Sequence, residues 1–326
     1  MILSEDKDFR SKSKSASRKD RKERKCFMAI TNYMTIDVED YFHVSAFEKQ
    51  SPPDTWAGRE CRVERNTDTV LNSLDSNNIK ATFFILGWVA ERYPHIAKLI
   101  YSQGHEVASH GYLHQRVALQ DRETYRQDIR RGKALLEDQI GAPVLGYRAP
   151  SYSITRQTAW AFDELIDAGF QYDSSIFPMQ HDFYGIPDCP RFAGYAVKNG
   201  DQWEESPSLS EEQTGIREIP ITTLRLGSRN LPIAGGGYFR LLPYAATRWG
   251  LKHINKKEQQ PFVFYLHPWE FDPEQPRMAD ASAKSKFRHY LNLTRTESRF
   301  NRLLNDFSFG PLKNALTSEY IENTKA

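Results

Sequence analysis

Cysteine is scarce in this sequence, with 3 residues in 326. Cys26, Cys61 and Cys189 are odd in number and show neither CxxC spacing nor a pairing pattern. A disulfide framework of the kind that stabilises small secreted domains is therefore not expected. Reduced thiols in a cytoplasmic protein fit this usage best.

Long apolar runs and a strong net charge are also missing. The longest strongly apolar run, Ala81–Ala90, is too short to span a bilayer, so we expect no transmembrane segment. The net charge of +2 conceals an asymmetry, because residues 1–26 hold ten Lys/Arg against five Asp/Glu and the other 300 residues hold 34 against 37. The mildly acidic body gives no reason to expect a nucleic-acid partner.

The basic leader has no apolar core and does not resemble a secretory signal. We predict a disordered segment over residues 1–31, with a basic arm that seeks a charged surface as the alternative.

The rest of the chain has the composition of a folded protein, with 39% hydrophobic and 13% aromatic residues. Short apolar runs alternate with segments of helical periodicity and with polar tips, which is typical of a parallel α/β protein. Residues 178–215 read as a long loop or insertion, and residues 283–305 as helical. The predicted strands lie near residues 33–37, 81–86, 104–108, 144–147, 170–172, 218–221 and 262–266.

Two histidines four residues apart follow the strand at 104–108. If this segment is helical, one turn places His110 and His114 on the same face, where they can hold a single metal ion. A hydrolytic metal site also needs a carboxylate and an open position. The alternative is a chance spacing on a solvated loop.

Three carboxylates within four residues, Asp37, Glu39 and Asp40, follow the strand at 33–37. They repel one another unless a cation, a proton or solvent intervenes, which points to functional use rather than to an exposed acidic turn. Strand alternation places Asp37 and Glu39 on the same side, whereas Asp40 joins them only if the chain turns after Val38.

Arg148, Asp173 and His267 follow three further strands. Each has an ordinary explanation: a surface salt bridge, a turn cap and a core histidine, respectively. Together with the acids and the histidine pair, however, they lie at the carboxyl ends of five strands, where a β/α barrel builds its active site.

At this point the ordered motifs resemble those of the polysaccharide deacetylases, the NodB-homology enzymes of carbohydrate esterase family 4. The resemblance covers roughly residues 32–272. It rests on Thr35-Ile36-Asp37, Thr82-Phe83-Phe84-Ile85-Leu86-Gly87, Gly104-His105-Glu106-Val107-Ala108-Ser109-His110, Arg148-Ala149-Pro150 and Leu266-His267.

Three further segments, Asp-Val-Glu-Asp-Tyr-Phe, Gly-Gly-Gly-Tyr-Phe-Arg and His-Pro-Trp-Glu, are similar to a bacterial subfamily encoded beside exosortase-linked exopolysaccharide clusters. The family fold implies a distorted (β/α) barrel with fewer than eight parallel strands. We expect this barrel at residues 32–272, with an insertion at about 178–215, and a helical extension packed on it at 273–326.

The resemblance also implies roles for individual residues. Asp37 matches the catalytic base, and His110 and His114 match two ligands of a divalent metal, for which we expect Zn2+. The usual first motif has two adjacent aspartates, but here Val38 follows Asp37, so Glu39 or Asp40 is the third ligand. The other implied roles are orientation of the base by Arg148, proton donation by His267, and pairing of Asp173 with that histidine. Tyr152 and Trp269 are candidates for stacking on sugar faces, with core packing as the alternative.

The function expected from these residues is metal-dependent removal of N-acetyl groups from an amino-sugar polysaccharide or its precursor, in exopolysaccharide biosynthesis. An amidohydrolase acting on a small-molecule amide is one alternative, because the insertion could restrict the site. A non-catalytic sugar-binding barrel is another, although binding alone does not need a base opposite an acid.

Overall fold

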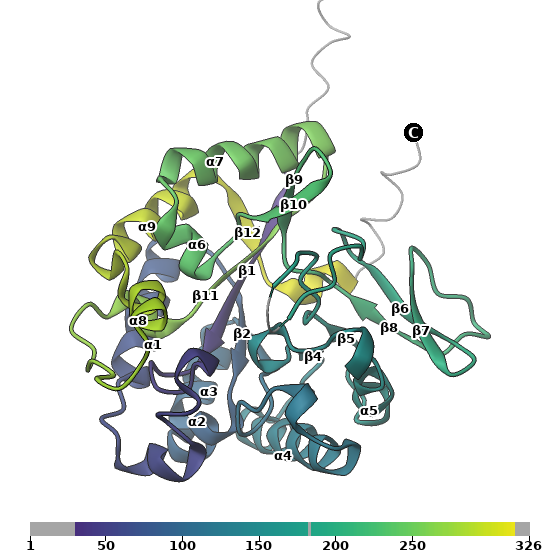
Figure 1. Ribbon diagram of the computed structural model, residues 1–326, viewed down its shortest axis with the longest axis horizontal. Helices are drawn as coiled ribbons and strands as arrows, with labels where there is room; N and C mark the ends of the chain where they lie inside the picture. The colour runs from purple at the N-terminus through teal and green to yellow at the C-terminus, as the bar shows by residue number, and fades with distance from the viewer. Residues whose placement is uncertain (1–29, 182–183, 317–326) are drawn as a thin grey trace, which may run out of the picture.

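A computed structural model describes residues 30–181 and 184–316, so all but the last two residues of the predicted basic leader lie outside the described part. Strand β1 (Thr31–Val38) runs through the middle of the molecule and is buried along almost its whole length (Figure 1). It pairs in parallel with β11 (Val263–Leu266) and with β2 (Thr82–Ile85). A strand buried on both faces needs a continuous apolar sequence, which explains the unbroken apolar runs.

The main sheet continues from β2 through parallel strands to an antiparallel hairpin. The strands after β2 are β3 (Glu106–Ser109), β4 (Gly146–Tyr147), β5 (Tyr172–Asp173), β8 (Gly215–Glu218), β6 (Gly194–Asn199) and β7 (Gln202–Ser206). The run from β11 to β8 is parallel and has fewer than eight strands, which confirms the predicted α/β fold. Within the described residues the hydrogen-bonded ladder does not close into a complete barrel.

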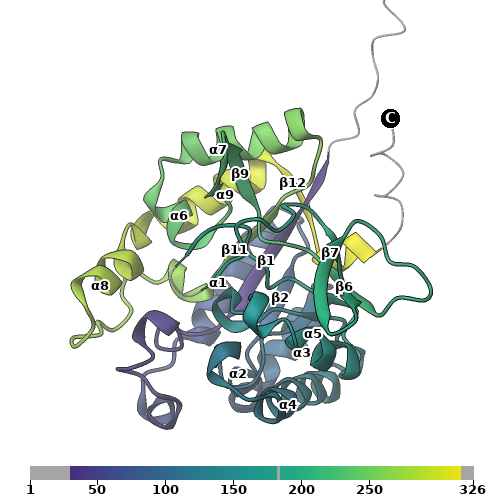
Figure 2. The same ribbon diagram turned by 45° about the vertical axis from the view of Figure 1, so that its right-hand side comes forward.

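Helices cover the outside of this sheet (Figures 1 and 2). A first group links the strands of the amino-terminal half and comprises α1 (Val63–Ser76), α2 (Gly87–Arg92), α3 (Pro94–Ser102), α4 (Arg122–Ile140) and α5 (Ala161–Asp167). A second group gathers on the β11 side and comprises α6 (Gly236–Leu241), α7 (Tyr244–His253), α8 (Ala283–Tyr290) and α9 (Thr296–Asp306). None of the helices in the described ranges is long and apolar enough to cross a membrane.

Two segments contain more β-structure than predicted. The expected loop at 178–215 holds the β6–β7 hairpin, and a smaller hairpin follows it, made of β9 (Thr223–Leu226) and β10 (Arg229–Pro232). The extension at 273–326, expected to be helical, also supplies β12 (Ser308–Gly310), which pairs in parallel with β1. The extension therefore joins the sheet as well as packing on it. The predicted boundaries between leader, barrel and extension stay a prediction.

Asp40 lies two residues after the end of β1, and its side chain binds the backbone at the start of α1. Its carboxylate accepts hydrogen bonds from the backbone N–H groups of Tyr41, Arg62 and Val63, at 2.8, 2.5 and 2.9 Å. A carboxylate at a helix N-terminus satisfies donors that the helix leaves unpaired and interacts favourably with the helix dipole. These bonds engage both oxygens of the fully buried Asp40, which favours Glu39 as the third metal ligand, and the assignment between the two stays a prediction.

Replacing Asp40 should therefore destabilise the fold. The Asp40→Ala variant leaves three backbone N–H groups without their acceptor, and we expect a loss of about 2–4 kcal/mol in the free energy of unfolding. Asp40→Asn keeps one carbonyl oxygen as an acceptor and should lose less. Urea denaturation of both variants measures the difference. An Asp40→Ala variant as stable as the wild type would contradict this role.

Candidate active site

The ends of β1, β3 and β11 converge on one cavity of about 450 Å³. Asp37 belongs to the end of β1, Glu39 and His110 directly follow β1 and β3, and His267 directly follows β11. Because parallel strands present their carboxyl ends at the same edge of a sheet, side chains far apart in the sequence meet there. The cavity is also lined by His114, Tyr152 and Trp269.

Asp37 is held by a buried arginine. The Arg148 guanidinium donates from Nη1 to Asp37 Oδ1 at 2.6 Å and to Thr35 Oγ1 at 2.8 Å. Tyr152 donates its hydroxyl to Asp37 Oδ2 at 3.3 Å. Neither Asp37 nor Arg148 is more than 2% exposed, so each charge depends on the other for compensation. The predicted orientation of Asp37 by Arg148 agrees with this geometry.

Glu39, His110 and His114 form a buried cluster in which one ligand atom from each lies within 4.8 Å of the others. Glu39 Oε2 lies 2.6 Å from His114 Nε2, but no well-aligned hydrogen-bond donor reaches this buried oxygen from the described residues. Burial opposes the ionisation of Glu39, but the charge of the nearby imidazoles, His114 first, lowers its pKa below the usual range. These three residues could hold a metal ion, and Glu39 is the carboxylate among them.

The tautomer of His110 follows from its partner. Its Nδ1 lies 2.8 Å from the backbone carbonyl of Arg148, which can only accept, so Nδ1 carries the proton and Nε2 keeps its lone pair. Burial lowers the pKa of His110 to about 4. A neutral imidazole fixed through its other nitrogen is the usual form of a histidine ligand.

The two histidines reach one another through a loop and not through the helical turn considered above. Gly111 has φ +73° and His114 φ 52°, both in the left-handed region. The Asp128 carboxylate on α4 fastens this loop by accepting from the backbone N–H groups of Tyr112 and Leu113, at 2.7 and 2.9 Å. An added Cβ at Gly111 would lie 2.8 Å from the Asp128 carboxylate, so this position needs glycine. Asp128, 17 positions further along the chain, therefore determines the conformation of the loop that carries His110 and His114.

His267 faces the acids from across the cavity. Its Nε2 lies 3.9 Å from Asp37 Oδ2 and 3.6 Å from Glu39 Oε1, and its Nδ1 lies 2.8 Å from Glu270 Oε1. Burial favours the neutral ring, but the hydrogen bond to Glu270 and the surrounding carboxylates raise the pKa of His267 to about 9. Arg240 in turn donates to Glu270 Oε2 at 2.6 Å.

Glu270 and Arg240 were not among the predicted site residues. Glu270 follows His267 by three positions, a spacing typical of a capping box, and its carboxylate also accepts from the backbone N–H of His267 at 3.1 Å. That local pattern could have identified it. Arg240 lies at the end of the Gly-rich segment and reaches Glu270 only through the fold.

Asp173 does not pair with His267, and this predicted role is wrong. Its carboxylate accepts from the backbone N–H and the hydroxyl of Ser175, at 2.9 and 2.6 Å. It also interacts with Glu218 on the neighbouring strand β8, and burial raises the pKa of both carboxyl groups. Asp173 is fully buried and does not line the cavity, because its position at a strand end does not fix the side to which it points.

The two candidate sugar-stacking rings are packed into the protein. Trp269 is 5% exposed, the imidazoles of His267 and His289 stack on it with centroids at 5.2 and 4.1 Å, and its Nε1 donates to Glu39 Oε1 at 3.2 Å. Tyr152 is 6% exposed, and its hydroxyl group is bound to Asp37. Core packing, the alternative considered for both rings, agrees with this burial better than an open sugar platform.

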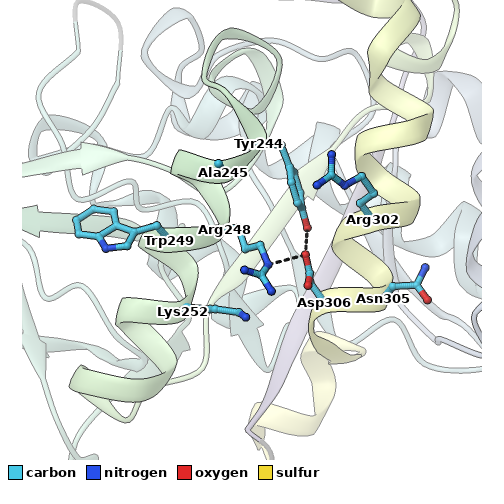
Figure 3. A pocket seen from close by; sticks show the side chains of 8 residues that line it. All are labelled: Tyr244, Ala245, Arg248, Trp249, Lys252, Arg302, Asn305 and Asp306. Carbon is cyan, nitrogen blue, oxygen red and sulfur yellow. Dashed lines mark hydrogen bonds and ion pairs between the residues drawn. The ribbon is translucent and has the colours of Figure 1, made fainter.

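A second cavity, of about 550 Å³, lies between α7 and α9 (Figure 3). Its acid, Asp306, accepts from the Tyr244 hydroxyl at 2.6 Å and from Arg248 Nε at 2.8 Å. Lys252 and Arg302 add positive charge. The described residues that line it include no histidine or cysteine, and the acid is already engaged by two donors. Unlike this second cavity, the cavity at the strand ends combines histidines with carboxylates, and we take it as the candidate active site.

Family models match the chain in two consecutive parts. Residues 54–172 match the model described as polysaccharide deacetylase, and residues 174–317 match a model described as a domain of unknown function, DUF3473. His110, His114 and Arg148 fall in the first part, His267 falls in the second, and Asp37 and Glu39 precede both. The cavity is therefore built from residues on both sides of the boundary between the two models.

Sequence relatives agree with the first match. A Bacillus cereus peptidoglycan-N-acetylglucosamine deacetylase is 34% identical over 30% of this chain and 36% of its own length. A Helicobacter pylori peptidoglycan deacetylase is 27% identical over 44% of this chain and 48% of its own length. The chain thus spans less than half the length of these two curated relatives, whereas another B. cereus peptidoglycan-N-acetylglucosamine deacetylase is 28% identical over 52% of this chain and 73% of its own length.

Solved structures share the fold. A Mycobacterium smegmatis protein provisionally assigned as a polysaccharide deacetylase has a TM-score of 0.54 at 19% identity, with 90% of each chain covered. The PuuE allantoinase has a TM-score of 0.50 at 12% identity, with 85% of each chain covered. Residues 54–172 are thus similar to the polysaccharide deacetylase family in sequence, and the solved structures share the overall fold of the chain.

Proposed function

We propose that this chain is a metal-dependent hydrolase that removes N-acetyl groups from an amino-sugar polysaccharide or its precursor. The observation that carries the proposal is the meeting, in one cavity, of a restrained carboxylate, a buried Glu/His/His cluster and a histidine whose pKa is raised to about 9. Hydrolysis of an amide needs a base for the attacking water and an acid for the departing amine. Asp37 and His267 have the positions for these two tasks.

The residues of the cluster fit a metal. Glu39 Oε2 is buried and has no well-aligned hydrogen-bond donor in the described part of the chain, and His110 Nε2 is left with a free lone pair by the bond that Nδ1 makes. Two imidazoles and one carboxylate are a ligand set found in catalytic zinc sites, which keep a further position open. Glu39, His110 and His114 would hold the ion, for which we propose Zn2+. A divalent ion bound there supplies Lewis-acid polarisation of a carbonyl oxygen.

Asp37 acts as the general base in this proposal. Arg148 restrains Oδ1 at 2.6 Å, whereas Oδ2 has longer contacts, with the Tyr152 hydroxyl at 3.3 Å and with His267 Nε2 at 3.9 Å. The carboxylate can therefore accept a proton from water without changing its rotamer. Because Arg148 is fully buried and also donates to the Ser174 carbonyl at 3.2 Å, it gives Asp37 a fixed orientation.

His267 acts as the general acid. With its pKa at about 9 it is charged at neutral pH, with Nδ1 donating to Glu270 and Nε2 directed toward the acids of the cavity. An amine leaves readily only when it is protonated, and the Nε2 proton is available for that step.

The proposed substrate class rests on the names of the relatives and on motif resemblance. Relatives from Bacillus cereus and Listeria monocytogenes are named peptidoglycan-N-acetylglucosamine deacetylases, which supports an N-acetylated amino sugar as the substrate. The exosortase-type motifs point to exopolysaccharide biosynthesis. The low cysteine content favours a reducing compartment, and hence a cytoplasmic precursor of the polymer as the molecule acted upon.

Metal content provides a direct test. Purified protein should carry about one divalent ion per chain. The Glu39→Ala and His110→Ala variants each lose one ligand and should lose most of the bound metal. Asp37→Asn should keep the metal but lose activity, because it removes the base and leaves the three ligands intact. Elemental analysis of the purified variants measures this.

Asp40→Asn is the matched control for Glu39→Ala, because it removes a neighbouring buried carboxylate that lies outside the cluster. It should keep its metal. Loss of metal from Asp40→Asn with retention in Glu39→Ala would move the ligand to Asp40, and a metal-free but active wild type would end the metal proposal.

The role of His267 can be separated from simple packing by the choice of leaving group. His267→Ala should slow the cleavage of an N-acetyl amide by about 10²–10⁴, the usual contribution of general acid–base catalysis. Hydrolysis of an activated aryl acetate should fall much less, because a phenolate leaves without a proton. A purely structural histidine predicts equal losses on both substrates together with a lower melting temperature, and that result would exclude the acid role.

The pH profile should respond to Glu270. His267 must be protonated to act, so activity falls as pH rises through its pKa, which Glu270 helps to raise to about 9. Glu270→Gln removes the negative charge and should move this alkaline fall to lower pH by roughly 1–2 units. The exposed Glu274, four positions later, gives the control Glu274→Gln. The comparison is made by measuring kcat/KM against pH for both variants. If activity in Glu270→Gln falls at the same alkaline pH as in the wild type, the role of His267 as the general acid is contradicted.

A further inference from the structure

Helix α8 forms part of the wall of the catalytic cavity. Lys284, Ser285, Arg288 and His289 all line it. Positions i, i+1, i+4 and i+5 lie on one side of an α-helix, so a single face of α8 is turned toward the cavity. This helix belongs to the region matched by the domain of unknown function.

The other charged side chains of this cavity already have partners of opposite charge. Arg116 pairs with Glu48 at 2.8 Å, and Arg240 pairs with Glu270 at 2.6 Å. Asp37 is bound by Arg148 at 2.6 Å. The remaining acid, Glu39, lies in the Glu/His/His cluster.

Lys284 and Arg288 differ from these groups. Both are exposed, and no carboxylate of residues 30–181 or 184–316 lies within 4 Å of either one. Arg288 acts electrostatically on Tyr184, which lines the same cavity. Lys286, on the same helix, is instead hydrogen-bonded to the backbone carbonyl of Ala279. Within the described residues, two positive charges without a carboxylate partner therefore lie at the cavity wall.

Isolated exposed cations are common on protein surfaces. A pair of them on the wall of a catalytic cavity, however, interacts electrostatically with any charged ligand that enters the cavity. Lysine and arginine bind carboxylate and phosphate groups through charge-assisted hydrogen bonds. A concave site focuses the field of its charges and raises the local concentration of an oppositely charged ligand. The cavity of about 450 Å³ has the size of a small-ligand site, so a short saccharide that reaches the Glu/His/His cluster also passes α8.

We propose that Lys284 and Arg288 form a subsite for an anionic group of the substrate. The preferred substrate is then an N-acetylated saccharide that carries a carboxylate or a phosphate on the reacting sugar or on its neighbour. The identity of the reacting N-acetyl group rests on the function proposed above, whereas the anion subsite rests on the two unpaired cations.

The kinetic test compares an acidic substrate with a neutral one. The probes are a hyaluronan tetrasaccharide, in which N-acetylglucosamine alternates with a uronic acid, and N-acetylchitotetraose, which has no charge. For the wild type, kcat/KM should be higher on the acidic probe, and the preference should weaken as salt is added. The Lys284→Gln/Arg288→Gln double variant should lower the ratio of the two kcat/KM values by roughly tenfold, the effect of losing two exposed ion pairs.

The second cavity supplies a matched control (Figure 3). Lys252 and Arg302 line it, and it shares no lining residue with the catalytic cavity. The Lys252→Gln/Arg302→Gln double variant removes the same two residue types and the same charge, and should leave the ratio as it is in the wild type. An equal fall in both double variants would mean that only the net charge matters, and would overturn the subsite.

A binding measurement decides the question independently of turnover. Calorimetric titration of the metal-loaded Asp37→Asn protein, with and without the Lys284→Gln/Arg288→Gln changes, compares the two tetrasaccharides. A second comparison, between N-acetylglucosamine 1-phosphate and N-acetylglucosamine, measures whether a phosphate group strengthens binding to the same proteins. Tighter binding of an acidic probe that disappears in the double variant supports the subsite, and the arm that responds identifies carboxylate or phosphate.

Failure of the subsite and failure of the proposed function give different results. Equal binding of charged and neutral probes overturns the subsite, even if the wild type releases acetate from both tetrasaccharides. Acetate release from none of the probes counts against the deacetylase function, and the titration still decides whether the two cations bind an anion.

Discussion

The ion pair between Arg148 and Asp37 is the contact on which the rest of the site depends. Arg148 donates to Asp37 on β1, to Thr35 on the same strand and to Ser174 after β5, and its own carbonyl fixes the ring of His110. A buried charge is costly unless it is paired, so neither partner can be removed without leaving the other uncompensated. One arginine thus couples the orientation of Asp37 to the geometry of the histidine pair.

A second network ties the region of unknown function to the same cavity. Strand β11 lies beside β1 in the sheet, and it delivers His267 opposite Asp37. Glu270 forms a hydrogen bond with Nδ1 of His267 and stabilises the charged form of this ring, and Arg240 in turn binds Glu270. The two matched regions consequently form a single sheet and a single site, and neither one contains all the groups that the proposed reaction needs.

The sequence was sufficient to predict the strands and the edge at which they end, because those features depend on local apolar patterns. Alternation along a strand also predicted that Asp37 and Glu39 face the same way. It could not show where Asp173 points, because that depends on Glu218 in a strand 45 positions later. The loop of the histidine pair is likewise set by Asp128, and the β6–β7 hairpin by pairing with β8, which no local pattern reveals.

The pairing of β12 with β1 has a consequence for how the protein folds. Asn32 donates to the carbonyl of Ser308, 276 residues away, and β1 also depends on β11 for one of its edges. The central strand therefore leaves the ribosome early but obtains two of its three neighbours only when most of the chain has been made. Contacts between such distant segments slow folding and expose unpaired strand edges in the meantime. A ribosome-bound chain stopped before β11 would hold Asp37 on a strand that has no partner on that side.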